Sequence, residues 1–167
     1  MLERVFDDLT IRHIRPTDKG LLAASFASLS DESRRARFLA PKPRLSSTDL
    51  RYLTEVDGTD HVALVALSPR LKGRILAVAR FVRTEPGADT AEFAITVGDE
   101  FQGRGLGTLL ADRLVLEALA RGIRRFTATT LSDNVPAQRL IAHLARRGLT
   151  HVGDADGVRE LVADLAA

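Results

Sequence analysis

The chain of 167 residues contains no cysteine and no tryptophan, and only one methionine and one tyrosine. The lack of cysteine excludes a disulfide scaffold, a cysteine-ligated metal centre and a thiol nucleophile. Long apolar runs are also missing, since none approaches the ~18 residues of a membrane-spanning helix. Charges interrupt the first eight residues, where a secretion signal needs an apolar core. We therefore expect a cytoplasmic protein without a membrane segment.

Charge of one sign is not in large excess, because 24 lysine and arginine residues stand against 22 acidic ones and leave a net charge of +2. Aromatic residues make up only 5% of the chain, whereas nucleic-acid binders usually combine a basic face with rings that stack on bases. The four histidines are scattered, without a metal-binding spacing such as H-E-x-x-H. We expect neither a nucleic-acid partner nor a bound metal.

What the chain does have is the 45% hydrophobic content of a globular protein, over a length typical of one domain covering residues 1–167. Hydrophobic periodicity predicts strands near residues 9–15, 61–67, 75–82, 91–97, 126–131, 149–153 and 158–164. Helices are predicted after the candidate cap Asp18, after Asp31 or Ser33, and after the run of capping residues at 46–49, and then over residues 105–121 and 136–147. This order predicts an α/β (mixed α+β) fold, with a mixed, mostly antiparallel sheet of about six to seven strands and helices on both faces.

The strand at residues 91–97 runs into a glycine-rich loop that opens the longest predicted helix. Along this strand the bulky residues at positions 93, 95 and 97 point to one face, whereas Glu92 and two small residues point to the other. The loop and helix start read Gln102-Gly103-Arg104-Gly105-Leu106-Gly107-Thr108. Unpaired N–H groups at a helix start attract phosphate oxygens, and glycines let the backbone approach a pyrophosphate closely.

This loop matches neither of two common nucleotide motifs. No Gly-Lys-Ser/Thr follows, which excludes a P-loop, and Thr108 stands where the dinucleotide fingerprint G-x-G-x-x-G needs its third glycine. The loop does match Q/R-x-x-G-x-G/A, and with it the chain resembles the GNAT superfamily of acyl-CoA-dependent N-acetyltransferases. The segment Leu131-Ser-Asp-Asn134-Val-Pro136 and the order of elements over residues 9–153 are similar to the family too. Within the family, segments 29–34, 61–65, 91–94 and 131–136 resemble the bacterial Pat-type protein lysine acetyltransferases.

The resemblance implies acetyl-CoA as co-substrate, in a V-shaped cleft where the strand ending at Val97 splays from its neighbour near residue 131. Backbone groups of Ile95, Thr96 and Val97 would pair with the pantetheine arm. The pyrophosphate loop and the opposite wall would supply the other contacts, from Gln102, Gly103, Arg104, Gly105, Leu106, Gly107, Thr108, Asn134 and Arg139.

Acetyl transfer to an amine needs a base, because a lysine amine with a pKa near ~10.4 is mostly protonated at neutral pH and only the neutral amine attacks a thioester. Glu92 is our candidate for this base. It matches the glutamate proposed as base in the Pat-type branch, and it lies on an otherwise small strand face, where desolvation would favour proton uptake. A solvent-facing strand glutamate without a catalytic role is the alternative.

Two positions depart from the family pattern. Many relatives carry a tyrosine seven residues after the asparagine, to protonate the leaving thiolate, but Ile141 stands there. The general acid is therefore unassigned, with Ser132 or water as candidates. Gly148-Leu149 lies about three residues beyond the usual spacing, which predicts a last helix nearly one turn longer.

A basic run at Arg34, Arg35, Arg37, Lys42 and Arg44 contains no acid, and it is interpreted either as the lining of an acceptor site or as a solvated helix face. The sequence thus predicts an N-acetyltransferase that moves acetyl to a primary amine, with a protein lysine as the favoured acceptor, by direct attack in a ternary complex. A small-molecule amine acetyltransferase and a non-catalytic acyl-CoA sensor share the same cofactor residues and stay open. We expect no regulatory domain within this length, and either a monomer or a homodimer.

Overall fold

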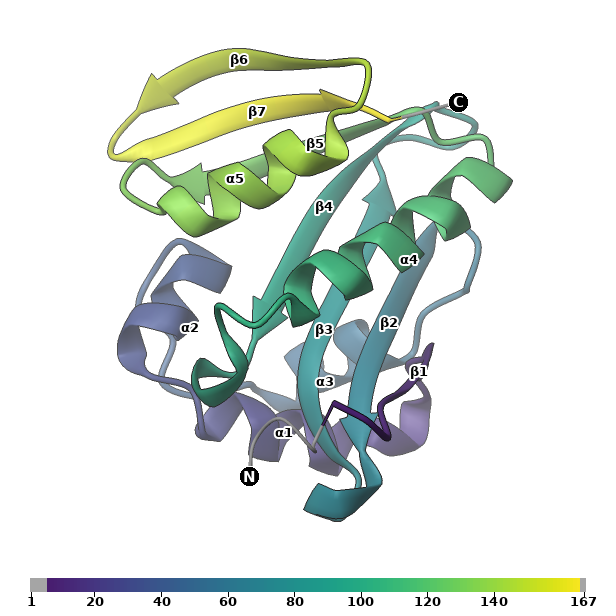
Figure 1. Cartoon of the computed structure of the whole chain (residues 1–167), viewed down its shortest axis with the longest axis vertical. Coiled ribbons are helices and arrows are strands. Elements are labelled where there is room, and N and C mark those ends of the chain that lie inside the picture. The colour runs from purple at the N-terminus through teal and green to yellow at the C-terminus, as the bar shows by residue number, and fades with distance from the viewer. Residues whose placement is uncertain (1–5, 166–167) are drawn as a thin grey trace.

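The computed structural model describes residues 6–165, in which seven strands form one sheet in the order β1-β2-β3-β4-β5-β7-β6 (Figure 1). The strands are β1 (Thr10–His13), β2 (His61–Ser68), β3 (Arg74–Arg83), β4 (Thr90–Val97), β5 (Arg125–Leu131), β6 (Gly148–Ala155) and β7 (Val158–Asp164). Neighbouring strands are antiparallel except β4 and β5, which run parallel. The predicted mixed, mostly antiparallel sheet is confirmed.

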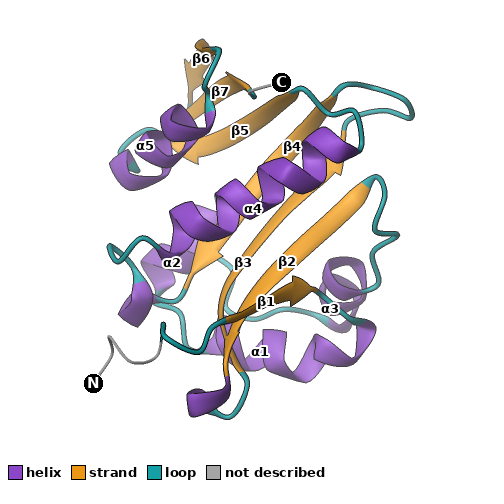
Figure 2. Cartoon of the chain, turned by 45° about the vertical axis from the view of Figure 1, so that its right-hand side comes forward, coloured by secondary structure: helices purple, strands orange, loops and turns teal. Residues whose placement is uncertain are grey.

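Helices cover both faces of this sheet, as predicted (Figure 2). They are α1 (Lys19–Ala27), α2 (Asp31–Phe38), α3 (Ser47–Thr54), α4 (Leu106–Ala120) and α5 (Val135–Leu144), with the short 3-10 turns η2 (Pro16–Asp18), η3 (Pro69–Leu71) and η4 (Asp99–Phe101). Helices α4 and α5 pack on one face and α1 and α3 on the other, and α2 contacts β4 and β5. No helix within residues 6–165 has the length and apolar character needed to cross a bilayer.

Two apolar cores fix the sheet between these helix layers. The larger core lies under α4 and α5, where the ring of Phe93 stacks on Phe126 at 5.3 Å between centroids and Phe81 packs on the same ring at 5.9 Å. The smaller core joins α1 and α3 to β2 and β3 through residues such as Leu22 and Leu53. Every residue of β2 is buried, which agrees with the continuous apolar run at residues 62–67 between His61 and Ser68.

Strands β4 and β5 separate after a short contact. They pair only over Thr90–Glu92 and Arg125–Thr127. Beyond that point β4 continues to Val97 paired with β3 alone, and β5 continues to Leu131 paired with β7 alone. Figure 1 shows the two strands diverging from this point. The predicted V-shaped splay of the sheet is therefore present.

Three local predictions need correction. Helix α5 ends at Leu144 rather than near residue 147, because Gly148 already pairs with Asp164 in the sheet and the intervening residues are used to turn into β6. The cap of α2 is Ser30, whose side chain accepts from the Ser33 N–H, rather than Asp31 or Ser33. Asp18 stands at the predicted N-cap position of α1, but its side chain makes no capping bond, since its carboxylate is held by Arg12 at 2.8 and 2.9 Å. Residues 1–5, which carried part of the argument on secretion, lie outside the described residues.

Candidate active site

The glycine-rich loop before α4 passes through left-handed backbone at Gly103 (φ 70°) and Gly105 (φ 84°), which other residues rarely adopt. A Cβ at either position would meet no atom within 4 Å, so the space above the loop is open. Hydrogen bonding of the helix begins with the Leu109 N–H donating to Gly105 O at 3.0 Å, which leaves the amides of Leu106 to Thr108 without a helical partner. These free N–H groups, at the positive end of the helix dipole, suit an anion.

Two other members of the loop motif have different surroundings. Arg104 is exposed beside the loop, where its charge is available to a ligand. Gly107 lies in the first turn of α4, and a Cβ there would come within 3.3 Å of Val97 Cγ2 and 3.7 Å of Ile95 Cδ1. The missing side chain at Gly107 therefore lets α4 begin directly on β4.

Gln102 is exposed, but its side-chain amide is bound to the protein. Its Nε2 donates to Val97 O at 3.0 Å and to Ser33 Oγ at 3.3 Å. Gln102 thus fixes the end of β4 and connects the loop to α2. In this structure its role is to position the loop, and a direct contact with a cofactor stays a prediction.

Strand β4 directs free backbone groups toward the opening. The Gly98 N–H donates to Leu76 O at 2.8 Å, which makes these two residues a hydrogen-bonded pair of the antiparallel β3–β4 ladder. Bonded and non-bonded pairs alternate along such a ladder, so the N–H groups of Val97 and Ile95 point away from β3. By the same alternation the backbone groups of Thr96 are used within the ladder.

The opposite wall is formed by the end of β5 and the start of α5. Asn134 caps α5, because its Oδ1 accepts from the Ala137 N–H at 3.2 Å. Arg139 is exposed on the following turn, and the Ser132 backbone N–H donates to Gly157 O at 2.8 Å. Ile141 is only 3% exposed and packs in the larger core, which leaves the general acid unassigned.

Glu92 stands where the sheet opens, since it is the last residue of β4 that pairs with β5. Its carboxylate lines a cavity of about 290 Å³ on the α2–α3 side of the sheet, together with Tyr52 and Lys42. The small strand face is present, since Ala94 follows Glu92 on the same side of β4. The expected desolvation is wrong, because the Glu92 side chain is exposed and Arg80 from β3 and Arg37 from α2 line the same cavity. This acceptor pocket, as we call the cavity, lies across β4 from the glycine loop.

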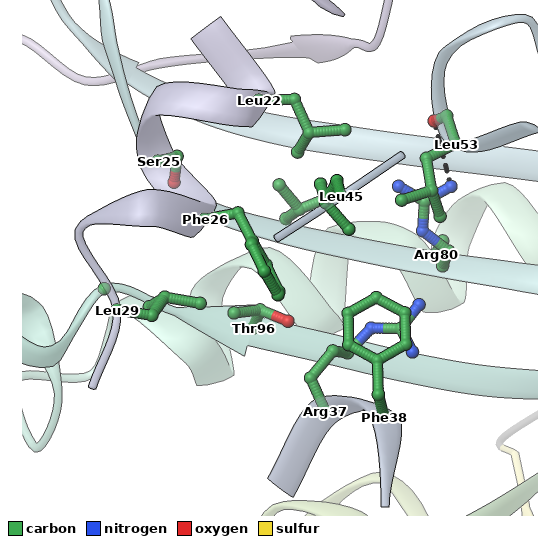
Figure 3. A pocket seen from close by; sticks show the side chains of 12 residues that line it. Leu22, Ser25, Phe26, Leu29, Arg37, Phe38, Leu45, Leu53, Arg80 and Thr96 are labelled. Carbon is green, nitrogen blue, oxygen red and sulfur yellow. Dashed lines mark hydrogen bonds between the residues drawn. The ribbon is translucent and has the colours of Figure 1, made fainter. Parts of the chain in front are cut away.

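A second cavity of about 40 Å³ adjoins the acceptor pocket and shares Arg37 and Arg80 with it. Figure 3 shows the two guanidinium groups at one end of this cavity, whereas Leu22, Phe26 and Leu29 line the rest. The two adjoining cavities thus have charged side chains where they meet, and the smaller one is otherwise mainly apolar.

Arg80 is buried, with 5% of its surface exposed. Its Nη1 donates to Leu53 O at 3.0 Å, at the C-terminal end of α3, and lies 3.0 Å from His61 Nε2. Burial, with a contribution from the charge of Arg37, lowers the pKa of Arg80 to about 9, and burial with the charge of Arg80 lowers the pKa of His61 to about 4. At neutral pH this places a charged guanidinium against a neutral imidazole.

The basic run divides between the two interpretations given above. Arg35 and Arg44 are exposed, as a solvated face requires. Arg34 donates to Leu29 O and Pro43 O and holds the loop after α2. The remaining two cations, Arg37 and Lys42, line the acceptor pocket.

A polar network links the glycine loop to α2. The Asp99 carboxylate accepts from the Ser30 N–H, the Ser30 hydroxyl and the Ser33 hydroxyl at 2.7 to 2.9 Å. Burial raises the pKa of Asp99, but the hydrogen bonds from Ser33 and Ser30 outweigh it, so the pKa is lowered and the carboxylate stays charged. Gln102 also bonds to Ser33, so the segments that shape the two sides of β4 are tied together.

Sequence reasoning missed Tyr52, His61 and Arg80 as residues of the site, and these residues come from three separate elements. Arg80 alone carries a local signal, since it is a charged residue at an inward position of an apolar strand. Among the described residues 6–165, no group of three or more His, Asp or Glu side chains is arranged to hold a metal ion.

The model of the acetyltransferase (GNAT) family matches residues 26–145, which is most of the chain. The chain belongs to the GNAT acetyltransferase family. Acetyltransferase Pat of Mycolicibacterium smegmatis is 43% identical over 95 residues, which make up 57% of this chain and 28% of Pat. This GNAT chain therefore corresponds to only part of that relative.

Two solved structures support the assignment. The GNAT domain of S. lividans PAT is 34% identical and superimposes with a TM-score of 0.82, over 93% of this chain and 89% of that domain. A cAMP-binding acyltransferase from Mycobacterium smegmatis is 32% identical, with a TM-score of 0.65 over 95% of this chain but only 44% of its own length. The predicted Pat-like GNAT domain is confirmed at the level of family and fold.

Proposed function

We propose that residues 1–167 act as one catalytic domain that transfers acetyl from acetyl-CoA to a primary amine, with a protein lysine as acceptor. The observation that carries this proposal is the position of Glu92. It lies at the point where β4 and β5 part, with the glycine loop on one side of the sheet and the acceptor pocket on the other. An amine in the pocket and an acyl group in the opening would meet beside this carboxylate.

The residues of the opening fit acetyl-CoA, which supplies an acetyl thioester. The amides of Gly103 to Thr108, with the charge of Arg104, suit the pyrophosphate, and open space above the two left-handed glycines admits it. The free N–H groups of Ile95 and Val97 suit the pantetheine arm and the thioester carbonyl. Asn134 and Arg139 would contact the cofactor from α5.

Glu92 would accept a proton from the acceptor amine, directly or through a water molecule. Its exposed carboxylate is open to the pocket, so it can exchange this proton with solvent between turnovers. Protein lysine is proposed as acceptor because of the similarity to Pat, and the cytoplasmic location expected from the lack of cysteine stays a prediction.

The test is transfer of radiolabelled acetyl from acetyl-CoA into acid-precipitable protein, with a soluble bacterial proteome as acceptor. Glu92→Gln is the test variant, and Glu85→Gln, an exposed glutamate in the β3–β4 turn, is its matched control. Label that enters protein with the wild type and the control, but not with Glu92→Gln, supports the proposal. Bound acetyl-CoA without any labelled protein would redirect it to a small-molecule acceptor or a sensor.

A further inference from the structure

The acceptor pocket contains two arginines without a carboxylate partner. Within residues 6–165, neither Arg37 nor Arg80 has an acidic oxygen within 4.0 Å, whereas Lys42 is neutralised by Asp49 at 3.0 Å. Glu92 is the only other acid that lines this pocket among the described residues. With the lysine pair cancelled, two guanidinium groups therefore face one carboxylate.

The hydrogen-bonding capacity of Arg80 is largely unused. A guanidinium has five N–H donors. Both contacts of Arg80, to Leu53 O and His61, are made through Nη1, and its Nε and Nη2 have no partner among the described residues. These two nitrogens are not among the buried atoms without a partner in residues 6–165, so they are open to the pocket that Arg80 lines, where a ligand can accept from them.

Arg37 is placed to complete the same site. It extends from α2 toward the end of the cavity where Arg80 lies (Figure 3), and its guanidinium carbon packs 4.7 Å from the Phe38 ring centre. Glu92 and Arg80 are diagonal neighbours on one face of the β3–β4 pair, since Ala94 pairs with Arg80. An anion bound to the two arginines would thus lie close to Glu92, the proposed base.

Resting on the proposed function, we propose that Arg37 and Arg80 form a carboxylate-binding subsite, so that the preferred acceptor carries a carboxylate close to its reactive amine. A planar guanidinium donates two parallel hydrogen bonds to a carboxylate, which gives geometric selection as well as charge. A bare ammonium entering this net positive pocket would be repelled, whereas an acceptor with its own anionic group is neutralised. The carboxylate belongs either to an acidic side chain beside a lysine or to a free amino acid.

The first experiment compares acceptors on the wild-type protein at saturating acetyl-CoA. End-blocked peptides with one lysine between two glutamates are compared with the same peptides carrying glutamines. Free lysine and glutamate are compared with their α-amides. We expect kcat/KM about ten-fold higher for the acidic member of at least one series, and that series identifies the source of the carboxylate. Equal values in both series would overturn the subsite.

Variants test the two arginines. Arg37→Gln is expected to remove the preference by slowing the acidic acceptor about ten-fold relative to the neutral one, and Arg37→Lys to restore it only in part. Arg35→Gln, on the exposed face of the same helix, is the matched control and should keep the preference. Equal slowing of both acceptors with a displaced pH profile would instead show that the arginines act on the base or the amine.

Arg80→Gln is the second variant, with its fold checked by thermal unfolding, because Arg80 also holds α3 through Leu53. If Arg80→Gln is unfolded, the comparison of acidic with neutral acceptors and the Arg37 variants test the subsite without it. Failure of the proposed function is recognised separately, as no acceptor-dependent release of CoA with any peptide or amino acid. In that case calorimetric binding of the two acetyl-lysine product peptides in the presence of CoA still tests the subsite, and equal affinities would overturn it.

Discussion

The two faces of β4 are built on different principles. On the α4 face, the side chains at positions 93, 95 and 97 join an apolar core, and the groups available to a ligand belong to the backbone of Gly103 to Thr108. On the α2–α3 face, Glu92 shares a cavity with charged side chains from other elements, among them Arg37 and Arg80. One strand thus separates a backbone-lined site from a side-chain-lined one.

This difference explains why the sequence predicts the site on one face of β4 but not the site on the other. A site made of backbone amides needs glycines in fixed order, and such an order is visible as a motif. A site made of side chains needs only that the fold brings distant residues together, as it does for Tyr52 on α3 and Arg80 on β3. The four predictions below test whether the two faces can be altered independently.

The largest effect is expected from Glu92→Gln, which should lower kcat by ~10²–10⁴ and leave the affinity for acetyl-CoA nearly unchanged. The amide keeps the shape of the side chain but cannot take a proton. Single-turnover kinetics measure the first quantity and calorimetry the second. Loss of both together, without loss in Glu85→Gln, would mean that Glu92 supports the fold of both faces.

Acid should weaken the α2–α3 face through His61. Its pKa is lowered from 6.5 to about 4, chiefly by burial and then by the charge of Arg80. Between these values the unfolded chain binds a proton that the folded chain does not. The free energy of unfolding is therefore highest above pH 6.5. It falls by about 2 kcal/mol, after allowance for solvent screening, as the pH drops toward 4.

Chemical denaturation across this pH range measures the effect. His61→Gln, which retains an acceptor for Arg80, should flatten the dependence. An unchanged slope in His61→Gln would show that other groups govern the acid response.

Gly105→Val should raise the dissociation constant of acetyl-CoA at least ~10-fold, about 1.4 kcal/mol, because the β-branched side chain is strained at φ 84° and fills the space above the loop. Gly87→Val is the matched control, since Gly87 has a similar φ of 78° and open surroundings in the distant β3–β4 turn. Calorimetry of both variants separates binding from strain. Equal losses of affinity in the two would remove the phosphate-loop assignment.

The smallest effect is expected from Gln102→Ala, but it joins the two faces. The variant loses the bonds to Val97 O and Ser33 Oγ, so the KM values of acetyl-CoA and acceptor should both rise about five-fold. Gly105→Val should change only the first of these. Steady-state kinetics with each substrate varied in turn measure both, and a change confined to the acetyl-CoA KM would show that α2 is held without Gln102.

Most of the fold was predictable because its signals are local. The apolar runs of β2 and β3 and the loop from Gln102 to Gly107 are each contiguous, and the structure has these elements within two residues of the predicted bounds. The end of α5 was not predictable, since it is decided by the pairing of Gly148 with Asp164 across the β6–β7 hairpin. The surroundings of Glu92 were missed for the same reason, because Arg37 lies 55 residues away in the chain.

The helical wall of the acceptor pocket is one uninterrupted stretch of chain, residues 31–54, which contains both α2 and α3. Nothing in the glycine loop or β4 is interleaved with it. An exchange of this single stretch between related genes would therefore replace the helical lining of the pocket in one recombination event and leave the glycine loop, β4 and Glu92 in place.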